Sequence, residues 1–153
     1  MAVSKKKVKQ EKEPRGNSIV QGGTPEQYYL HHPSWNFSSC DKEKWSLNTA
    51  EVHEIFWKEI LPHLQGWETQ TWREILVNSK KQNHSIEVRK LNKIAVDRLG
   101  ELYIEAESLI SLRLTATHRV YGYLNGAVFN ILWIDLEHGD NVMCVCRSYK
   151  KHT

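Results

Sequence analysis

The chain lacks a long apolar run: no stretch approaches the roughly 20 residues that a membrane-spanning helix needs. Its N-terminus carries lysines, but no apolar segment follows them, so it does not have the pattern of a secretory signal. Cysteine is scarce as well, and Cys40, Cys144 and Cys146 form an odd set without paired CxxC spacing. These absences argue against a disulfide scaffold, and they predict a cytoplasmic protein that has no membrane partner.

Charge is distributed unevenly along the 153 residues, whose formal net charge is +3. Residues 1–15 carry six Lys or Arg against two Glu, a net +4, which leaves −1 for the rest of the chain. Residues 1–23 contain too little apolar surface to order themselves, so we expect a disordered basic tail there and a single domain over 24–153. The alternative is that the tail is an arm that docks on nucleic acid or on an acidic partner.

Three successive strands are predicted near the C-terminal end of the domain. Residues 109–114, 119–124 and 127–134 are apolar or alternate in polarity, and Asn125-Gly126 between the last two is a strong hairpin signal. The third strand is apolar on both faces apart from Asn130, which indicates a central position. Residues 142–146 are expected to form a fourth strand at an edge.

Helices are expected to come before these strands. An apolar stripe predicts a helix over about 49–64, which begins at a capping box formed by Asn48 and Glu51 and ends at Gly66. A second helix is expected over about 92–101. The predicted fold class is therefore α+β: an antiparallel meander of about four strands, with N-terminal helices packed on one face.

Candidate chemistry begins with Arg113 and Arg119, which fall on neighbouring predicted strands. Two guanidinium groups on one sheet face can hold one phosphate, although ion pairing with nearby carboxylates would give the same pattern. His138 follows the central strand, and a histidine there can act as a general base near neutral pH. The alternative is a loop histidine whose ring is satisfied by the backbone.

Residues 71–100 carry seven Lys or Arg against three Asp or Glu, and they are the best candidate for a nucleic-acid-binding face on the domain. A solvated charged surface would have the same composition. No metal site and no cofactor are expected, because the sequence contains neither zinc-ligand spacing nor a glycine-rich phosphate loop. The candidate nucleic-acid-binding residues are Lys80, Lys81 and His84 in this region, with Lys150 and Lys151 at the C-terminus.

Two family resemblances follow from these residues. The segments Thr71-Trp72-Arg73-Glu74-Ile75, Ser111-Leu112-Arg113-Leu114 and Lys150-Lys151-His152-Thr153 resemble a family of small, uncharacterised bacterial and phage-borne proteins that end in a CPSKKKHT-like tail. This chain departs from that tail at Arg147 and Tyr149, and the family implies no known activity.

The second resemblance covers about residues 91–142, whose order of helix, strands and hairpin is similar to the RelE/ParE family of bacterial toxins. It implies that Arg113 and Arg119 correspond to basic residues on an exposed sheet face. The RelE branch cleaves mRNA at the ribosome without a metal, by attack of a 2′-hydroxyl on the adjacent phosphate. The ParE branch inhibits gyrase and does not cut RNA, so the fold alone does not decide the activity.

The sequence therefore leaves three hypotheses open. The first is a RelE-like toxin-class module that acts on RNA as a metal-independent endoribonuclease, with the ribosome as a partner. The second is a non-enzymatic binding or inhibitor protein on the same scaffold, such as a ParE-like inhibitor or a defence-system component. The third is a small nucleic-acid-binding protein that uses its basic tail. An antitoxin-like protein partner is expected under the first two hypotheses.

Overall fold

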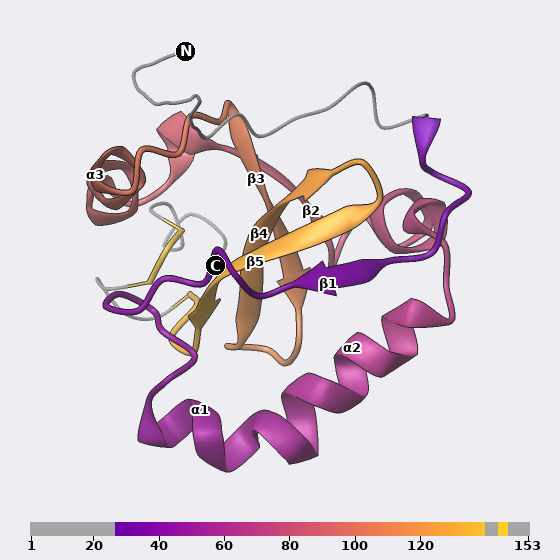
Figure 1. The fold of residues 1–153 in the computed structure, drawn as a ribbon, viewed down its shortest axis with the longest axis horizontal. Helices are drawn as coiled ribbons and strands as arrows, with labels where there is room; N and C mark the ends of the chain where they lie inside the picture. Colours follow the sequence, from indigo (N-terminus) through magenta and orange to yellow (C-terminus); the bar gives the residue numbers. More distant parts are fainter. Residues whose placement is uncertain (1–26, 140–143, 147–153) are drawn as a thin grey trace.

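The computed structural model describes residues 27–139 and 144–146, and it confirms the α+β class (Figure 1). Within these ranges, no helix is both long enough and apolar enough to cross a membrane. The strands are β1 (Ser34–Asn36), β2 (His84–Glu87), β3 (Ser108–Arg113), β4 (Arg119–Asn125) and β5 (Val128–Asp135). The helices are α1 (Ala50–Ile55), α2 (Leu61–Glu68) and α3 (Lys93–Glu101), with π-helical turns η2 (Phe56–Ile60) and η3 (Glu74–Asn78) and the 3₁₀ turn η4 (Val88–Lys90).

The sheet has five strands in the order β1-β5-β4-β3-β2. Strands β2 to β5 pair antiparallel, whereas β1 pairs parallel to β5 with Trp35 opposite Phe129. The prediction of a wholly antiparallel sheet of about four strands is therefore wrong, and the sheet is mixed. The parallel pair is possible because almost the whole domain separates β1 from β5, which leaves room for the crossover that parallel strands require.

The β4–β5 hairpin forms where the sequence predicts it. Asn125 pairs with Val128, and Gly126 adopts a positive φ of 63°, as the tight turn requires. The register shifts between Tyr121 and Gly122, so that β5 has one extra residue opposite this step. Side chains of β5 enter the cores on both faces, which explains why most of its sequence is apolar.

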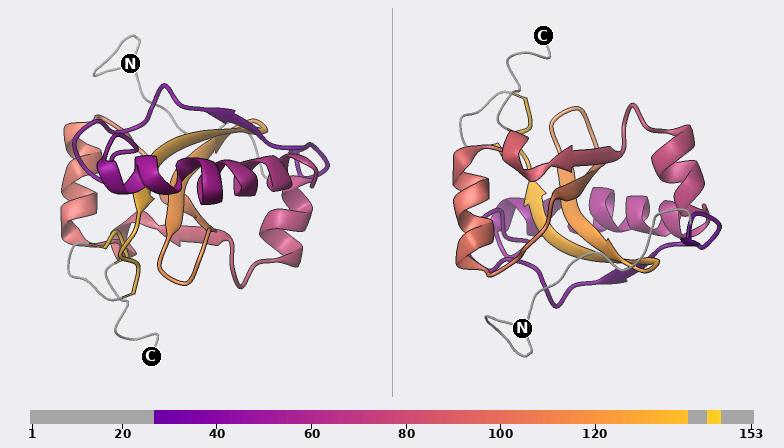
Figure 2. Two further views of the ribbon diagram at one scale, coloured as in Figure 1. Left: turned by 90° about the horizontal axis from the view of Figure 1, so that it is seen from below. Right: turned by 90° about the horizontal axis from the view of Figure 1, so that it is seen from above.

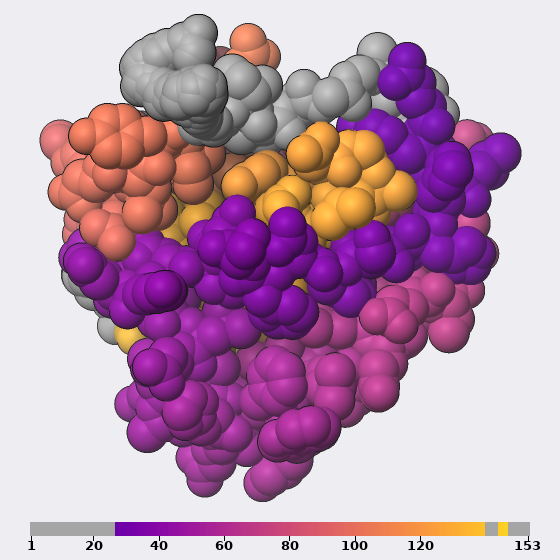
Figure 3. Space-filling view, viewed as in Figure 1, coloured from indigo at the N-terminus to yellow at the C-terminus, as the bar shows by residue number. Residues whose placement is uncertain are grey.

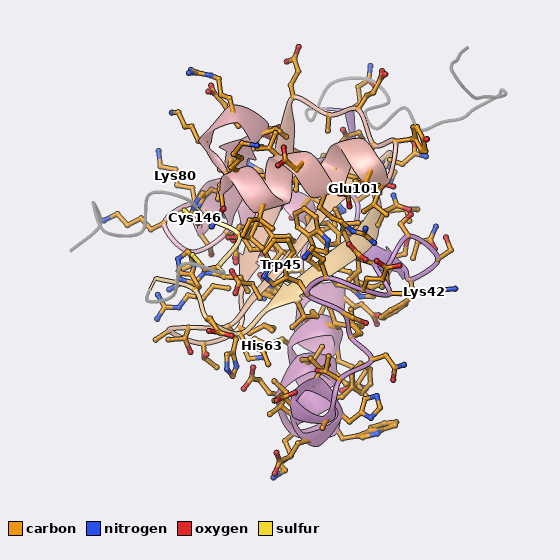
Figure 4. All side chains as sticks on the ribbon, turned by 90° about the vertical axis from the view of Figure 1, so that its left-hand side faces the viewer. Lys42, Trp45, His63, Lys80, Glu101 and Cys146 are labelled. Atoms are coloured by element: carbon orange, nitrogen blue, oxygen red, sulfur yellow. The ribbon has the colours of Figure 1, made fainter. Side chains whose placement is uncertain are left out.

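Helices cover both faces of the sheet, and the prediction of helices on one face is wrong. The continuous helix formed by α1, η2 and α2 packs on one face, where Val52, Ile60 and Leu64 enter the core (Figure 2). Helix α3 packs on the opposite face, where Ala95 and Leu99 meet the inner strands (Figure 4). The physical reason is β5 itself, because a strand that is apolar on both faces needs cover on both.

Helix ends follow local capping chemistry. The first helix begins one residue later than the predicted capping box, because Thr49 rather than Asn48 is the N-cap and accepts from the Val52 N–H at 3.2 Å. It continues to Glu68, past the predicted end, because Gly66 is accommodated inside α2. Helix α3 begins after Asn92, whose side chain accepts from the Ile94 N–H at 3.0 Å, close to the predicted boundary.

Two further segments lie near the ends of the described chain: the one that contains β1, and residues 144–146. In Figure 3 the early segment that contains β1 runs across the molecule between the β4–β5 hairpin and the first helix. The predicted fourth strand is described only over residues 144–146, which join no strand of the sheet; Cys146 forms an isolated antiparallel bridge with Leu91. The predicted basic tail, residues 1–23, lies outside the described residues and stays a prediction.

Candidate functional site

A pocket of about 290 Å³ opens at the β2 side of the α3 face of the sheet. Four residues singled out in the sequence meet there, namely Lys81, His84, Arg119 and His138, although the first and the last are 57 positions apart. The lining residues are Lys81, Gln82, His84, Ile86, Lys90, Ser111, Arg119, His138 and Cys146. This set is called the basic pocket below.

The turn that carries Lys81 is fastened to the sheet by Asn83, which is buried. The Asn83 Oδ1 accepts from the Arg113 backbone N–H at 2.9 Å, and its Nδ2 donates to the Ile75 carbonyl at 3.3 Å. One amide side chain therefore ties η3, the turn and β3 together. It fixes the turn next to the strand, which keeps Lys81 at the wall of the pocket.

Strand pairing places the next residues. His84 on the edge strand β2 lies directly opposite Ser111 on β3, and Ser111 lies opposite Tyr121 on β4. Direct cross-strand partners point to the same face of a sheet, so these three side chains form a row on the α3 face. Tyr121 packs in the core beneath α3, whereas His84 and Ser111 line the basic pocket.

A second row of side chains lies two residues away from the first on both β3 and β4. Arg113, Arg119 and Asp135 are consecutive cross-strand partners on β3, β4 and β5, so the predicted proximity of the two arginines is confirmed. Their surroundings differ. Arg119 is only 9% exposed and lines the basic pocket, whereas Arg113 is exposed and is not among the lining residues.

The Arg119 guanidinium also holds a loop in place. Its Nη1 donates to the carbonyls of Thr115, Ala116 and His118 in the β3–β4 connection. Burial lowers the pKa of Arg119, and the nearby Arg113 charge lowers it further, against opposing effects of Tyr121 and Asp135. An arginine keeps its charge despite such a shift, so a desolvated cation stands at the pocket wall.

His138 and Cys146 close the remaining sides. The His138 backbone N–H donates to the Thr117 carbonyl at 2.9 Å, which fixes the residue after β5 against the β3–β4 loop. The segment 144–146 is held by Asn92, whose backbone N–H donates to the Val145 carbonyl at 2.7 Å. Both walls are therefore positioned by backbone hydrogen bonds and do not depend on the side chains that face the pocket.

The side chain of Asp135 also anchors the segment 144–146. Its fully buried carboxylate accepts from the backbone N–H groups of Val145 and Glu137 at 2.8 and 2.9 Å. Burial raises the pKa of Asp135, while these two hydrogen bonds and the Arg119 charge act to lower it. Asp135 is not among the lining residues, which include three Lys or Arg and two His but no carboxylate within the described chain. This composition favours an anionic ligand.

The other predicted site residues lie elsewhere. Lys80 is exposed on the same turn as Lys81 but does not line the basic pocket, and Figure 4 shows it on the same side of the view as Cys146. Lys150 and Lys151 lie outside the described residues. His118, the other histidine near a strand end, contacts Glu59 at 2.6 Å between Nδ1 and Oε2 and is not a lining residue. In the part of the chain that the structure describes, no three His, Cys, Asp or Glu side chains are grouped to hold a metal ion.

Sequence reasoning missed several lining residues. Lys90 belongs to the segment 71–100, which has an excess of positive charge. The sequence shows this charge, but it does not show that Lys90 lines a pocket. Ser111 carried no individual signal, because one serine in an apolar strand is unremarkable until its cross-strand partners are known. The remaining missed residues are Gln82, Ile86 and Cys146.

Comparison with known proteins adds no relative: no family model, no curated protein and no solved structure matches this chain. Both family resemblances therefore stay predictions from the sequence.

Proposed function

We propose that the protein is a metal-independent endoribonuclease of the RelE-like toxin class and that the basic pocket binds the phosphodiester backbone of RNA. The observation that carries this proposal is the meeting of Lys81, Lys90 and Arg119 with two histidines in one pocket, without a carboxylate among its described lining residues. Fixed cations stabilise the charge that develops on a reacting phosphate, and histidines move protons near neutral pH. The resemblance of residues 91–142 to the RelE/ParE family supports the same choice and suggests a RelE-like fold.

The proposed reaction needs two proton transfers. One histidine removes the proton of a ribose 2′-hydroxyl, whose oxygen then attacks the adjacent phosphorus. The bond from phosphorus to the 5′-oxygen breaks, and the second histidine gives a proton to that oxygen. The products are a 2′,3′-cyclic phosphate and a 5′-hydroxyl, and no electrons are gained or lost. His84 and His138 are the candidates for this pair because both line the pocket, and Arg119 is the candidate for charge stabilisation.

Arg113 has a separate role in this proposal. It is exposed beside Arg119 on the neighbouring strand and stands outside the lining. We assign it to the phosphate that flanks the reacting one, together with Lys80 on the exposed turn. The protein would then act in the cytoplasm beside the ribosome, where an antitoxin-like partner would hold it inactive.

The test is cleavage of a single-stranded RNA oligonucleotide by the purified protein in the presence of EDTA, with and without added ribosomes. We expect products that end in a cyclic phosphate, and no cleavage at a linkage that carries a 2′-deoxyribose. His84→Ala and His138→Ala should each lower the rate by about 100-fold or more, the usual contribution of a general acid or base. His53→Ala is the matched control, because His53 is exposed on α1 and is not a lining residue.

A binding protein without catalysis is the second candidate, and one observation favours it. Three loop carbonyls already accept from Nη1 of Arg119, which gives this residue a structural task that catalysis does not require. If the protein binds the RNA but leaves it intact even with ribosomes, the binding or inhibitor hypothesis replaces the nuclease. If it neither binds nor cleaves RNA, both proposals for the basic pocket fail.

A further inference from the structure

The Tyr121 hydroxyl is the feature of this region that the proposed reaction leaves unused. Tyr121 is 0% exposed, and no residue of the described chain forms a hydrogen bond with its hydroxyl oxygen. Buried hydroxyl groups are almost always hydrogen-bonded, and an exception calls for an explanation. Burial raises the pKa of Tyr121, so the phenol keeps its proton and remains a hydrogen-bond donor.

A neighbour on the same strand shows the ordinary arrangement. Tyr123 lies two residues further along β4 and points to the same face, and its hydroxyl contacts the Ser39 hydroxyl at 3.1 Å. The missing partner of Tyr121 is therefore particular to its position and is not a property of tyrosines on this strand.

Tyr121 is next to a residue of the basic pocket on the neighbouring strand. Its direct cross-strand partner is Ser111, which is almost fully buried and lines the pocket. Ser111 is near enough to lower the pKa of the phenol, although the two hydroxyls do not meet the geometry of a hydrogen bond. The Ser111 side chain has three staggered rotamers, so its hydroxyl can change direction without any movement of the backbone.

We infer that Tyr121 is a positioning residue for the bound phosphate and that it acts through Ser111. When a phosphate oxygen occupies the basic pocket, the Ser111 hydroxyl donates to it. The Ser111 oxygen then accepts from the Tyr121 hydroxyl, and the buried phenol gains a hydrogen-bond partner. A hydroxyl that accepts one hydrogen bond donates a stronger one, so Tyr121 strengthens a contact that it does not make itself.

This inference rests on the proposed function, because it requires that the basic pocket binds a phosphate group. The test uses the full chain and inorganic phosphate as the probe. Phosphate binding is followed by NMR at fixed pH and ionic strength, with ¹³C at the Cζ atoms of the tyrosines. In the wild type we expect the Tyr121 Cζ signal to shift as phosphate binds and the Tyr123 signal to stay in place. In Ser111→Ala the Tyr121 shift should disappear.

The dissociation constant for phosphate supplies the second readout. Tyr121→Phe should weaken binding about three- to tenfold, and Ser111→Ala about tenfold, the effect of losing roughly one hydrogen bond. The double variant should bind no more weakly than Ser111→Ala alone, because the contribution of Tyr121 passes through Ser111. Tyr123→Phe is the matched control and should bind phosphate like the wild type.

Thermal unfolding separates this role from a structural one. Removal of an unsatisfied hydroxyl should leave the melting temperature of Tyr121→Phe equal to or above that of the wild type, whereas Tyr123→Phe should melt lower. The inference is overturned if phosphate leaves the wild-type Tyr121 signal unmoved, or if the losses in Tyr121→Phe and Ser111→Ala multiply. If the wild type binds RNA but phosphate leaves the Tyr121 signal unmoved, only this inference fails. If the wild type binds neither RNA nor phosphate, the proposed function fails as well.

Discussion

Arg113 and Arg119 lie directly opposite each other on β3 and β4, yet only Arg119 is buried at the wall of the basic pocket. The adjacent charges repel, and the Arg113 charge lowers the pKa of Arg119. Arg119 is held against this repulsion by the three loop carbonyls that accept from its Nη1. Two arginines that the sequence presents as an equal pair therefore differ in what their removal would do to the fold.

Arg119→Ala should destabilise the protein by about 2 kcal/mol, because the variant loses charge-assisted hydrogen bonds and leaves carbonyls of residues 115–118 without their donor. Arg113→Ala should change stability by less than about 0.5 kcal/mol, as expected for an exposed side chain. Urea denaturation of the two variants measures the difference. Equal stability of both variants would mean that the Arg119 contacts to the loop contribute nothing.

Gly122 is required by the close approach of β5. A Cβ atom at this position would lie 2.2 Å from the Asn130 carbonyl oxygen and 2.7 Å from the Phe129 ring. The first of these atoms is backbone and cannot move without breaking the register, so Gly122→Ala should cost about 3 kcal/mol or prevent folding. Gly66→Ala is the control, because nothing lies within 4 Å of a Cβ there. In the interior of α2 it should stabilise by about 0.5–1 kcal/mol, and thermal unfolding compares the two.

The parts of the fold that the sequence predicts are those governed by local chemistry. The Asn125-Gly126 turn, the strands on either side of it and the start of α3 near residue 92 depend on residues close together in the chain. The pairing of β1 with β5 joins residues more than 90 positions apart, and no local signal encodes a partner at that distance. Both covering helices are predicted from local patterns, but they are predicted on one face. The packing of α3 on the face opposite α1 and α2 depends on contacts between residues far apart in the chain.

The sequence predicts the members of the candidate site singly or in small groups and not as one pocket. The sequence presents Arg119 as a partner of Arg113, Lys81 and His84 as parts of one basic turn, and His138 alone. The structure brings these four residues to the lining of one pocket. Their convergence depends on Asn83, which ties the basic turn to β3, and on the β2–β3 register, which places His84 beside Ser111. Neither contact has a sequence pattern, because both are made between side chains and strands that the fold brings together.

Asp41 is a further residue that the sequence does not single out, and it joins three elements. Its fully buried carboxylate accepts two hydrogen bonds from Arg98 of α3, each at 2.8 Å, and one from the Trp133 indole of β5 at 2.9 Å. Burial alone would raise the pKa of Asp41, but the hydrogen bonds from Arg98, Trp133 and two backbone N–H groups outweigh it and lower the pKa below the ordinary value of 3.8. The ionised form is therefore favoured in the folded protein.

Asp41→Asn should destabilise the protein at neutral pH by about 3 kcal/mol, because it breaks a buried pair and leaves Arg98 short of its main partner. Glu101→Gln is the control: Glu101 also contacts Arg98, at 2.9 Å, but it is exposed, and its loss should cost less than about 1 kcal/mol.

The effect of Asp41 should depend on pH. A carboxyl group whose pKa is lower in the folded than in the unfolded protein stabilises the fold fully above its unfolded pKa, and this stabilisation is lost as the pH falls through its folded pKa. The difference between wild type and Asp41→Asn should therefore stay constant from pH 7 to about 5 and shrink below about pH 4. Denaturation at a series of pH values measures this, and a difference that is unchanged down to pH 2 would show that the Asp41 charge does not hold α3 against the sheet.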